Sequence, residues 1–271
     1  MSTISILGCG WFGFHFANIL MNDRHQVNGS TTSESKLSHL ASVGIKPYRI
    51  TVTPQELAID ASFFDCEILV ITIPPRSNSM REYLMGINNI IHEIRQHRIS
   101  KVIFISSTSV FGDVNGHVNE ITPTAPTTEP GKYLVAAELL FKDDAFATTV
   151  VRFGGLVGDT RDPGKFFAGK KYIPNGQAPV NLIHQEDCSG ICRSIINQNS
   201  FGHTIHACSP DHPKKQDFYT LASLRSKLLK PEFVDELNGW KIVDSINTAR
   251  LLSYEFQVGD WMRWLKREAA G

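Results

Sequence analysis

The chain has 271 residues, of which 42% are hydrophobic and 20% are charged, and its 27 basic side chains balance 27 acidic ones. This length and apolar content exclude wholesale disorder and allow a large core without metal or disulfide staples. The balanced charge gives no case for nucleic acid or an anionic membrane as a partner, because both recruit basic patches.

Five cysteines, an odd number without a Cys-x-x-Cys pair, favour a reducing compartment, so we expect a cytoplasmic protein. The stretch before Asp23 is uncharged. Its three glycines and polar side chains nevertheless predict a strand, a turn and a helix in place of a signal peptide or membrane span. The histidines and the cysteine between residues 203 and 212 match no familiar zinc spacing, so no metal site is predicted.

Short apolar runs alternate with helical patterns through the first 158 residues. Apolar, β-branched segments predict buried strands at residues 4–8, 25–30, 48–52, 67–73, 101–106 and 148–153. Apolar side chains at helical spacing predict helices after residue 11, up to residue 44, over 79–98 and over 134–141. Strands that alternate with helices indicate βαβ units, and hence a doubly wound parallel sheet of the α/β class.

The pattern changes after Gly158. Residues 159–182 are rich in Gly, Pro, Asn and Lys, which predicts mostly loop. Beyond them we expect a helix near 186–197, a strand near 203–208, a helix near 216–229 and a short closing helix from residue 260. We therefore divide the chain into a core, residues 1–158, and a mixed segment, residues 159–271, which returns to the core and forms a small α+β lobe.

The strongest local signal is a glycine-rich turn between the first strand and the first helix. It reads Gly8-Cys9-Gly10-Trp11-Phe12-Gly13, a G-x-G-x-x-G in the context that this motif requires. Gly8 permits the tight turn, Gly10 lets the backbone approach a pyrophosphate, and Gly13 lets helix and strand pack closely. The helix N-terminus then favours the anion. We predict an NAD(P) site here; the alternative is a glycine-rich turn without a ligand.

The end of the second strand bears on the choice of cofactor. NAD-binding turns carry an acid about 20 residues after the first glycine, where it holds the ribose 2′-hydroxyl. Here no carboxylate precedes Glu34, and Ser30, Thr31, Thr32 and Lys36 could instead hold a 2′-phosphate. We therefore predict NADP in preference to NAD. The alternative is that these hydroxyls only cap the following helix.

Four stretches together resemble the extended short-chain dehydrogenase/reductase family, also described as NAD-dependent epimerases/dehydratases. They are GCGWFG at 8–13, ISSTSVFGD at 105–113, VVRFGGLVG at 150–158 and VNLIHQEDCSGI at 180–191. With DPGKFFAGK at 162–170, the chain looks most like the small, atypical YeeZ-like branch of that family. The resemblance implies a Rossmann core and a C-terminal substrate lobe.

The resemblance also implies roles for residues at the strand ends. Ile73 and Pro74 would border the adenosine, Ser106 and Ser107 would lie beside the nicotinamide, and Phe153 and Gly154 would cover it. Asn181 and His184 would face the substrate, and Asp187 would cap the following helix. A hydrogen-bonded, half-buried histidine is the plainer interpretation of His184. Relatives dimerise through helices that correspond here to 79–98 and 131–142, so a homodimer is expected by resemblance only.

The usual catalytic pair of the family is missing. That family pairs a hydroxyl residue, here Ser107, with Tyr-x-x-x-Lys, in which the lysine lowers the pKa of the tyrosine. Alignment places Pro130 and Leu134 at the tyrosine and lysine positions. Tyr133, about 60° round the helix from Pro130, is a displaced catalytic candidate or an ordinary packed tyrosine.

Other groups have to be considered if chemistry occurs. Arg76 and His184 are further candidates, and Lys165 lies in a basic, aromatic loop that either holds an anionic group of the substrate or is simply solvated. We predict an NAD(P)-dependent oxidoreductase or epimerase acting at a carbon–oxygen centre of a small polar substrate, such as a nucleotide sugar. The alternatives are a non-catalytic NADP(H) sensor and an empty pocket.

Overall fold

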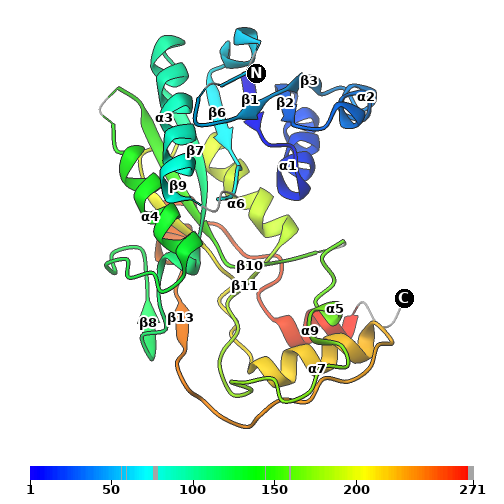
Figure 1. Ribbon diagram of the computed structural model, residues 1–271. Coiled ribbons are helices and arrows are strands. Elements are labelled where there is room, and N and C mark those ends of the chain that lie inside the picture. Colours follow the sequence, from blue (N-terminus) through cyan, green and yellow to red (C-terminus); the bar gives the residue numbers. More distant parts are fainter. Residues whose placement is uncertain (56, 59, 76–78, 144, 159, 268–271) are drawn as a thin grey trace.

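The structure is a computed structural model that describes residues 1–55, 57–58, 60–75, 79–143, 145–158 and 160–267. A seven-stranded, wholly parallel sheet forms its centre (Figure 1). From edge to edge the strands are β12 (Thr204–Ala207), β9 (Ala147–Phe153), β7 (Lys101–Ser107), β6 (Ile68–Ile71), β1 (Thr3–Leu7), β2 (Gln26–Thr31) and β3 (Lys46–Arg49). The predicted doubly wound α/β fold is confirmed.

Helices cover both faces of this sheet (Figure 1). Helices α3 (Met80–Gln96) and α4 (Glu129–Leu140) pack on one face, and α1 (Trp11–Asn22) and α6 (Gln185–Asn197) pack on the other. Smaller helices complete the core: α2 (Leu37–Ser42), α8 (Ile246–Leu252), and the 3-10 turns η1 (Glu34–Lys36), η2 (Ala61–Phe64) and η3 (Thr108–Val110). Because both faces are buried, the strands carry near-continuous apolar runs.

Three boundaries differ from the sequence prediction. The strand expected at 48–52 begins at Lys46 and is interrupted, so that β4 (Thr51–Val52) pairs with β5 (Leu57–Ala58) outside the main sheet. Helix α4 begins at Glu129 because the Thr128 side chain accepts a hydrogen bond from the Gly131 N–H at 3.3 Å. The helix expected to reach residue 229 ends at Arg225.

The later segments divide between sheet and lobe. Strand β12 joins the main sheet, whereas helices α5 (Gly164–Phe167), α7 (Lys215–Arg225) and α9 (Trp261–Arg267) lie together at one end of the molecule (Figure 1). Two parallel strand pairs connect lobe and core: β10 (Gly155–Val157) with β11 (Leu182–His184), and β8 (Gly116–Val118) with β13 (Lys241–Val243). The division at residue 158 stays a prediction.

All five cysteines are free thiols. Among the described helices, no candidate for a membrane crossing has the necessary length and apolar character. In the described part of the chain no three metal-ligating side chains gather. Helices α3 and α4 pack side by side and expose Met85 and Leu139, but the homodimer through them stays a prediction.

Candidate active site

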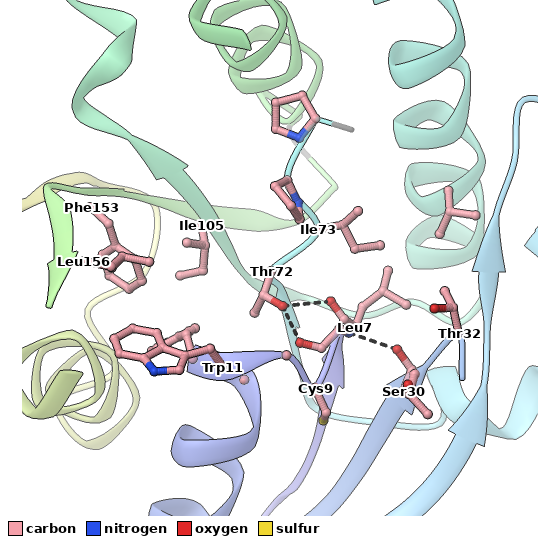
Figure 2. A pocket seen from close by; sticks show the side chains of 18 of the residues that line it. Leu7, Cys9, Trp11, Ser30, Thr32, Thr72, Ile73, Ile105, Phe153 and Leu156 are labelled. Atoms are coloured by element: carbon pink, nitrogen blue, oxygen red, sulfur yellow. Dashed lines mark hydrogen bonds between the residues drawn. The ribbon is translucent and has the colours of Figure 1, made fainter. Parts of the chain in front are cut away.

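The glycine-rich turn lies where the strand order of the sheet reverses, between β1 and β6. Open parallel sheets bind their ligands at this switch point, outside the carboxyl ends of the strands. Gly8 has a φ of +111°, which only glycine adopts without strain. The turn is tied to both neighbouring strands: the Thr72 hydroxyl donates to the Gly8 carbonyl at 2.6 Å, and the Ser30 hydroxyl accepts from the Gly8 N–H at 2.9 Å (Figure 2).

Gly13 and Gly10 serve different purposes in the turn. A Cβ at Gly13 would press into the Gly8 carbonyl oxygen, so the close contact of helix and strand requires glycine there. A Cβ at Gly10 would meet nothing within 4 Å, and it would project into open space at the start of α1. Gly10 is the N-cap residue of that helix and offers no side-chain cap. The turn therefore leaves bare main chain and an uncapped helix N-terminus facing a free volume, as a pyrophosphate requires.

That free volume is a cavity of about 590 Å³ above the strand ends. All fourteen residues predicted to bind the cofactor line it, namely Gly8, Gly10, Trp11, Phe12, Gly13, Ser30, Thr31, Thr32, Lys36, Ile73, Pro74, Ser106, Phe153 and Gly154. Figure 2 shows ten of the lining side chains by name, with Trp11, Phe153 and Leu156 at one end and Ser30 and Thr32 at the other. The lining residues include two cations, Lys36 and Arg161, and no carboxylate among those described. Shape, bare backbone and charge all fit a dinucleotide.

The end of the cavity beside β2 and η1 carries hydroxyls and one ammonium group. Thr31, Thr32 and Lys36 line it, while the nearby Glu34 is absent from the lining and pairs with Arg49 at 3.1 Å. The Thr31 hydroxyl also accepts from the Ser33 N–H at 3.2 Å, so it stabilises the local turn as well. Among the described lining residues, no carboxylate therefore lies beside Thr31, Thr32 and Lys36.

A buried polar network, which the sequence analysis did not recognise, supports the opposite end. The Ser106 hydroxyl donates to the Glu138 carboxylate at 2.6 Å, and the same carboxylate accepts two hydrogen bonds from Arg152, at 2.7 and 3.1 Å. Arg152 extends to the His206 ring at 3.4 Å. The sequence offered one signal of this network: Glu138 and Arg152 are single charged residues within the largely apolar segments 134–141 and 148–153. The network fixes Ser106 with its proton directed at Glu138 and its lone pairs free.

Ser107 occupies a different position at the same strand end. Its hydroxyl oxygen accepts from the Ser109 N–H at 3.1 Å, so its proton is available to a substrate oxygen. It lines the cofactor cavity and also a second cavity, of about 350 Å³, towards the lobe. The second cavity is lined by Ser107, Thr108, Ser109, Gly155, Phe167, Val180, Asn181, Leu182, Lys215, Tyr219 and Lys241.

The structure does not bring together the remaining catalytic candidates. Leu134, at the lysine position of the family, lines the cofactor cavity with an apolar side chain, and Pro130 lies in the first turn of α4. Tyr133 is buried in the core, with its ring 6.3 Å from that of Tyr83, and it lines neither cavity. Arg76 lies outside the described residues. A catalytic role for Tyr133 stays a prediction.

Of the three predicted substrate residues, Asn181 lines the second cavity, whereas His184 and Lys165 line neither of these two cavities. Its amide donates to the Lys241 carbonyl and accepts from the Val243 N–H, both at 2.8 Å, so it anchors β13. His184 caps α6 by accepting from the Glu186 N–H at 3.3 Å, and Lys165 is exposed.

The cap assigned to Asp187 is therefore wrong. This buried carboxylate instead accepts hydrogen bonds from Tyr254 at 2.9 Å, from the Gln257 N–H at 2.7 Å and from the Val258 N–H at 3.1 Å. Three donors from the C-terminal segment meet one carboxylate, which ties that segment to α6.

Arg161 is a further lining residue that the sequence analysis missed. Its guanidinium carbon lies 4.9 Å from the centre of the Trp11 ring, and Trp11 is the first residue of α1. Gly158 makes room for the same ring, since a Cβ there would approach it to 3.0 Å. The loop after β10 is thereby stacked against the glycine-rich turn, and it brings a positive charge to the cavity.

A family model described as NAD(P)H-binding matches residues 8–187 of the chain. The chain belongs to the NAD(P)H-binding family. Protein YeeZ of Escherichia coli strain K12 is 35% identical over 269 residues, which cover 96% of this chain and 97% of the relative. The resemblance to the atypical YeeZ-like branch is confirmed.

Two solved structures extend the likeness of this NAD(P)H-binding chain to its whole length. A functionally unknown conserved protein from Silicibacter pomeroyi DSS superposes with a TM-score of 0.82 at 20% identity, over 100% of this chain and 99% of the other. UDP-glucuronic acid 4-epimerase from Bacillus cereus, solved in complex with NAD, has a TM-score of 0.79 at 17% identity, over 99% and 96%. The fold is therefore that of the NAD-dependent epimerases/dehydratases.

Proposed function

We propose that the protein is an NADP(H)-dependent oxidoreductase or epimerase that acts at a carbon–oxygen centre of a small polar substrate. The observation that carries the proposal is the position of Ser107 on the wall shared by the cofactor cavity and the second cavity. Hydride transfer requires the nicotinamide and the substrate carbon to be in contact, so the junction of the two cavities is where the reaction would occur.

Bound there, a nicotinamide cofactor supplies or accepts the hydride. The Ser107 hydroxyl would donate a hydrogen bond to the substrate oxygen and so hold the reacting carbon at the junction. Ser106 cannot donate in the same way, because its proton is committed to Glu138 at 2.6 Å; it accepts instead, for example from the carboxamide N–H of the cofactor. Phe153 and Leu156 exclude water from this end.

The charges of the cavity favour the phosphorylated cofactor. Lys36, with Thr31 and Thr32, would hold the 2′-phosphate, and Arg161, which stacks on Trp11 beside Gly10, would contact the pyrophosphate. NADPH is therefore expected to bind more tightly than NADH. A titration that follows tryptophan fluorescence tests this, because Trp11 lines the cavity; equal or tighter binding of NADH would refute the preference.

Turnover is tested by the oxidation of NADPH with a panel of ketones, aldehydes and sugar nucleotides. Ser107→Ala should lower turnover and leave the affinity for NADPH unchanged, whereas Ser42→Ala, at an exposed site on α2, is the matched control. A Ser107→Ala enzyme as active as the wild type would refute the role of this hydroxyl.

A non-catalytic NADP(H) sensor is the second candidate. It is favoured by one observation: Leu134 faces the cofactor cavity where the family has its lysine. A side chain without a titratable proton cannot lower the pKa of a tyrosine or transfer a proton. Tight binding of NADPH without turnover of any member of the panel would support the sensor over the enzyme.

A further inference from the structure

The second cavity contains two cations that the sequence analysis did not assign. Lys215, on the lobe, and Lys241, on β13, both line it, and the lining includes no carboxylate among the described residues. The apolar part of the wall includes the rings of Phe167 and Tyr219. Lys215 and Lys241 are both half-buried, so solvent screens their attraction for an entering anion less than it would at a fully exposed site.

Lys215 is the less neutralised of the two. Its ammonium nitrogen lies 5.2 Å from the ring centre of Phe167 and donates to the Pro174 carbonyl at 3.0 Å. Within the described part of the chain no carboxylate lies within 4.0 Å of it. It is also the first residue of α7, where the helix dipole disfavours a cation. Its burial lowers the pKa of its ammonium group, as expected for a charge without a counter-ion.

Lys241 brings a second ammonium group from a well-held strand. Its nitrogen donates to the Phe111 carbonyl at 3.1 Å and lies 3.4 Å from the Asp113 carboxylate, which is largely exposed and so neutralises it only in part. The side chain of Asn181 fixes the backbone of the same strand on both sides of Ile242. The cavity is thus lined by two lysines in defined positions. Among the described lining residues no buried carboxylate neutralises them.

We propose that the second cavity binds a compact anionic substrate, a carbonyl compound or alcohol that carries a carboxylate or a phosphate, with its acid group at Lys215 and Lys241 and its reacting oxygen at Ser107. This inference rests on the proposed function, because it uses Ser107 as the point of contact with the cofactor. The size of the cavity supports it: at about 350 Å³, against 590 Å³ for the cofactor cavity, it suits a molecule much smaller than a dinucleotide.

The test compares matched anionic and neutral probes on the protein saturated with NADP⁺. Pyruvate is paired with acetone, and dihydroxyacetone phosphate with dihydroxyacetone; UDP-glucose is included as the larger anion. Dissociation constants are measured by calorimetry. At least one compact anion should bind about ten- to a hundredfold more tightly than its neutral partner, the gain of one charge-assisted hydrogen bond. Which pair shows the difference distinguishes carboxylate from phosphate.

Lys215→Met should abolish that difference and leave the affinity for NADPH unchanged, and Lys215→Arg should retain it. Lys230→Met, at an exposed lysine that lines neither cavity, is the matched control. Equal binding of anionic and neutral probes, an undiminished difference in Lys215→Met, or UDP-glucose binding more tightly than both compact anions would overturn the proposal. Failure of the wild type to bind any nicotinamide dinucleotide would instead refute the proposed function itself.

Discussion

Gly10 and Gly13 stand three residues apart in one motif, yet the structure predicts opposite consequences for the same substitution. A Cβ at Gly10 has no protein atom within 4 Å, and the backbone there, at φ −80°, is open to any residue. Gly10→Ala should therefore fold normally and place its methyl group where the pyrophosphate meets the main chain. Gly13→Ala drives the same methyl group into the Gly8 carbonyl oxygen.

The magnitudes separate the two variants. Replacing a glycine N-cap by alanine costs less than about 1 kcal/mol of stability. Displacing the pyrophosphate loses charge-assisted hydrogen bonds worth about 1.5–3 kcal/mol each, so the loss of two weakens binding about a hundredfold or more. Overpacking at Gly13 should cost about 1–3 kcal/mol of stability. In a chain of this size that lowers Tm by about 2–4 °C per kcal/mol.

Two measurements on each variant suffice: Tm without ligand, and the dissociation constant for NADPH from tryptophan fluorescence. Gly10→Ala should retain its Tm and lose binding, whereas Gly13→Ala should lose Tm. A Gly10→Ala protein that binds NADPH as tightly as the wild type would show that no phosphate approaches this part of the backbone. The assignment of the cavity to a dinucleotide would then be refuted.

Three further variants test other parts of the site. Glu138→Gln leaves the Arg152 guanidinium buried without its carboxylate and should cost about 3–5 kcal/mol in urea unfolding, more than the paired Glu138→Leu/Arg152→Met change; the reverse order would contradict this. Lys36→Gln should weaken NADPH binding about two- to tenfold and leave NADH binding unchanged, by fluorescence titration. Burial lowers the pKa of His206 below its usual 6.5. Just below pH 6.5 this histidine is therefore protonated in the unfolded chain and still neutral in the folded chain. Unfolding free energy should therefore fall as pH drops below that value and level off above it. His206→Gln should flatten this dependence, and an unchanged slope would exclude His206 as its source.

The cofactor cavity could be predicted from the sequence because its determinants are local. The end of a strand, three glycines and the start of a helix lie within eleven consecutive residues from Ile4 to Phe14, and their geometry follows from backbone sterics alone. The residues at the ends of β6, β7 and β9 were assigned to the same cavity through the family resemblance, and the strand order explains why they meet at the switch point. Parallel topology converts sequence order into position at one edge of the sheet.

The second cavity could not be predicted in this way because its walls come from distant segments without regular alternation. Ser107 and Lys215 are 108 residues apart, and the pairing of β8 with β13 that brings in Lys241 joins two short strands with little periodic signal. The lysine expected to contact substrate, Lys165, belongs to a short helix that exposes it, while its neighbour Phe167 turns inward. In the absence of a repeating pattern, which member of a basic, aromatic loop faces a cavity depends on tertiary packing.

The enzyme and the sensor make different demands on the residues at the junction of the two cavities. Near the nicotinamide end the described lining residues offer Ser106, whose proton is committed to Glu138, Ser107 and the apolar Leu134. The Cys9 thiol also lines the cofactor cavity, but burial raises its pKa to about 12, so it stays protonated and cannot act as a base at neutral pH. In the second cavity the described lining offers the ammonium groups of Lys215 and Lys241 and the Tyr219 hydroxyl, and burial raises the pKa of Tyr219 to about 12 as well. An enzyme of this kind, without the tyrosine and lysine of the family, thus depends on Lys215 and Lys241 to hold its substrate, whereas a sensor does not. Lys215→Met distinguishes them, because it should suppress turnover in the enzyme and leave NADPH binding unaltered in both.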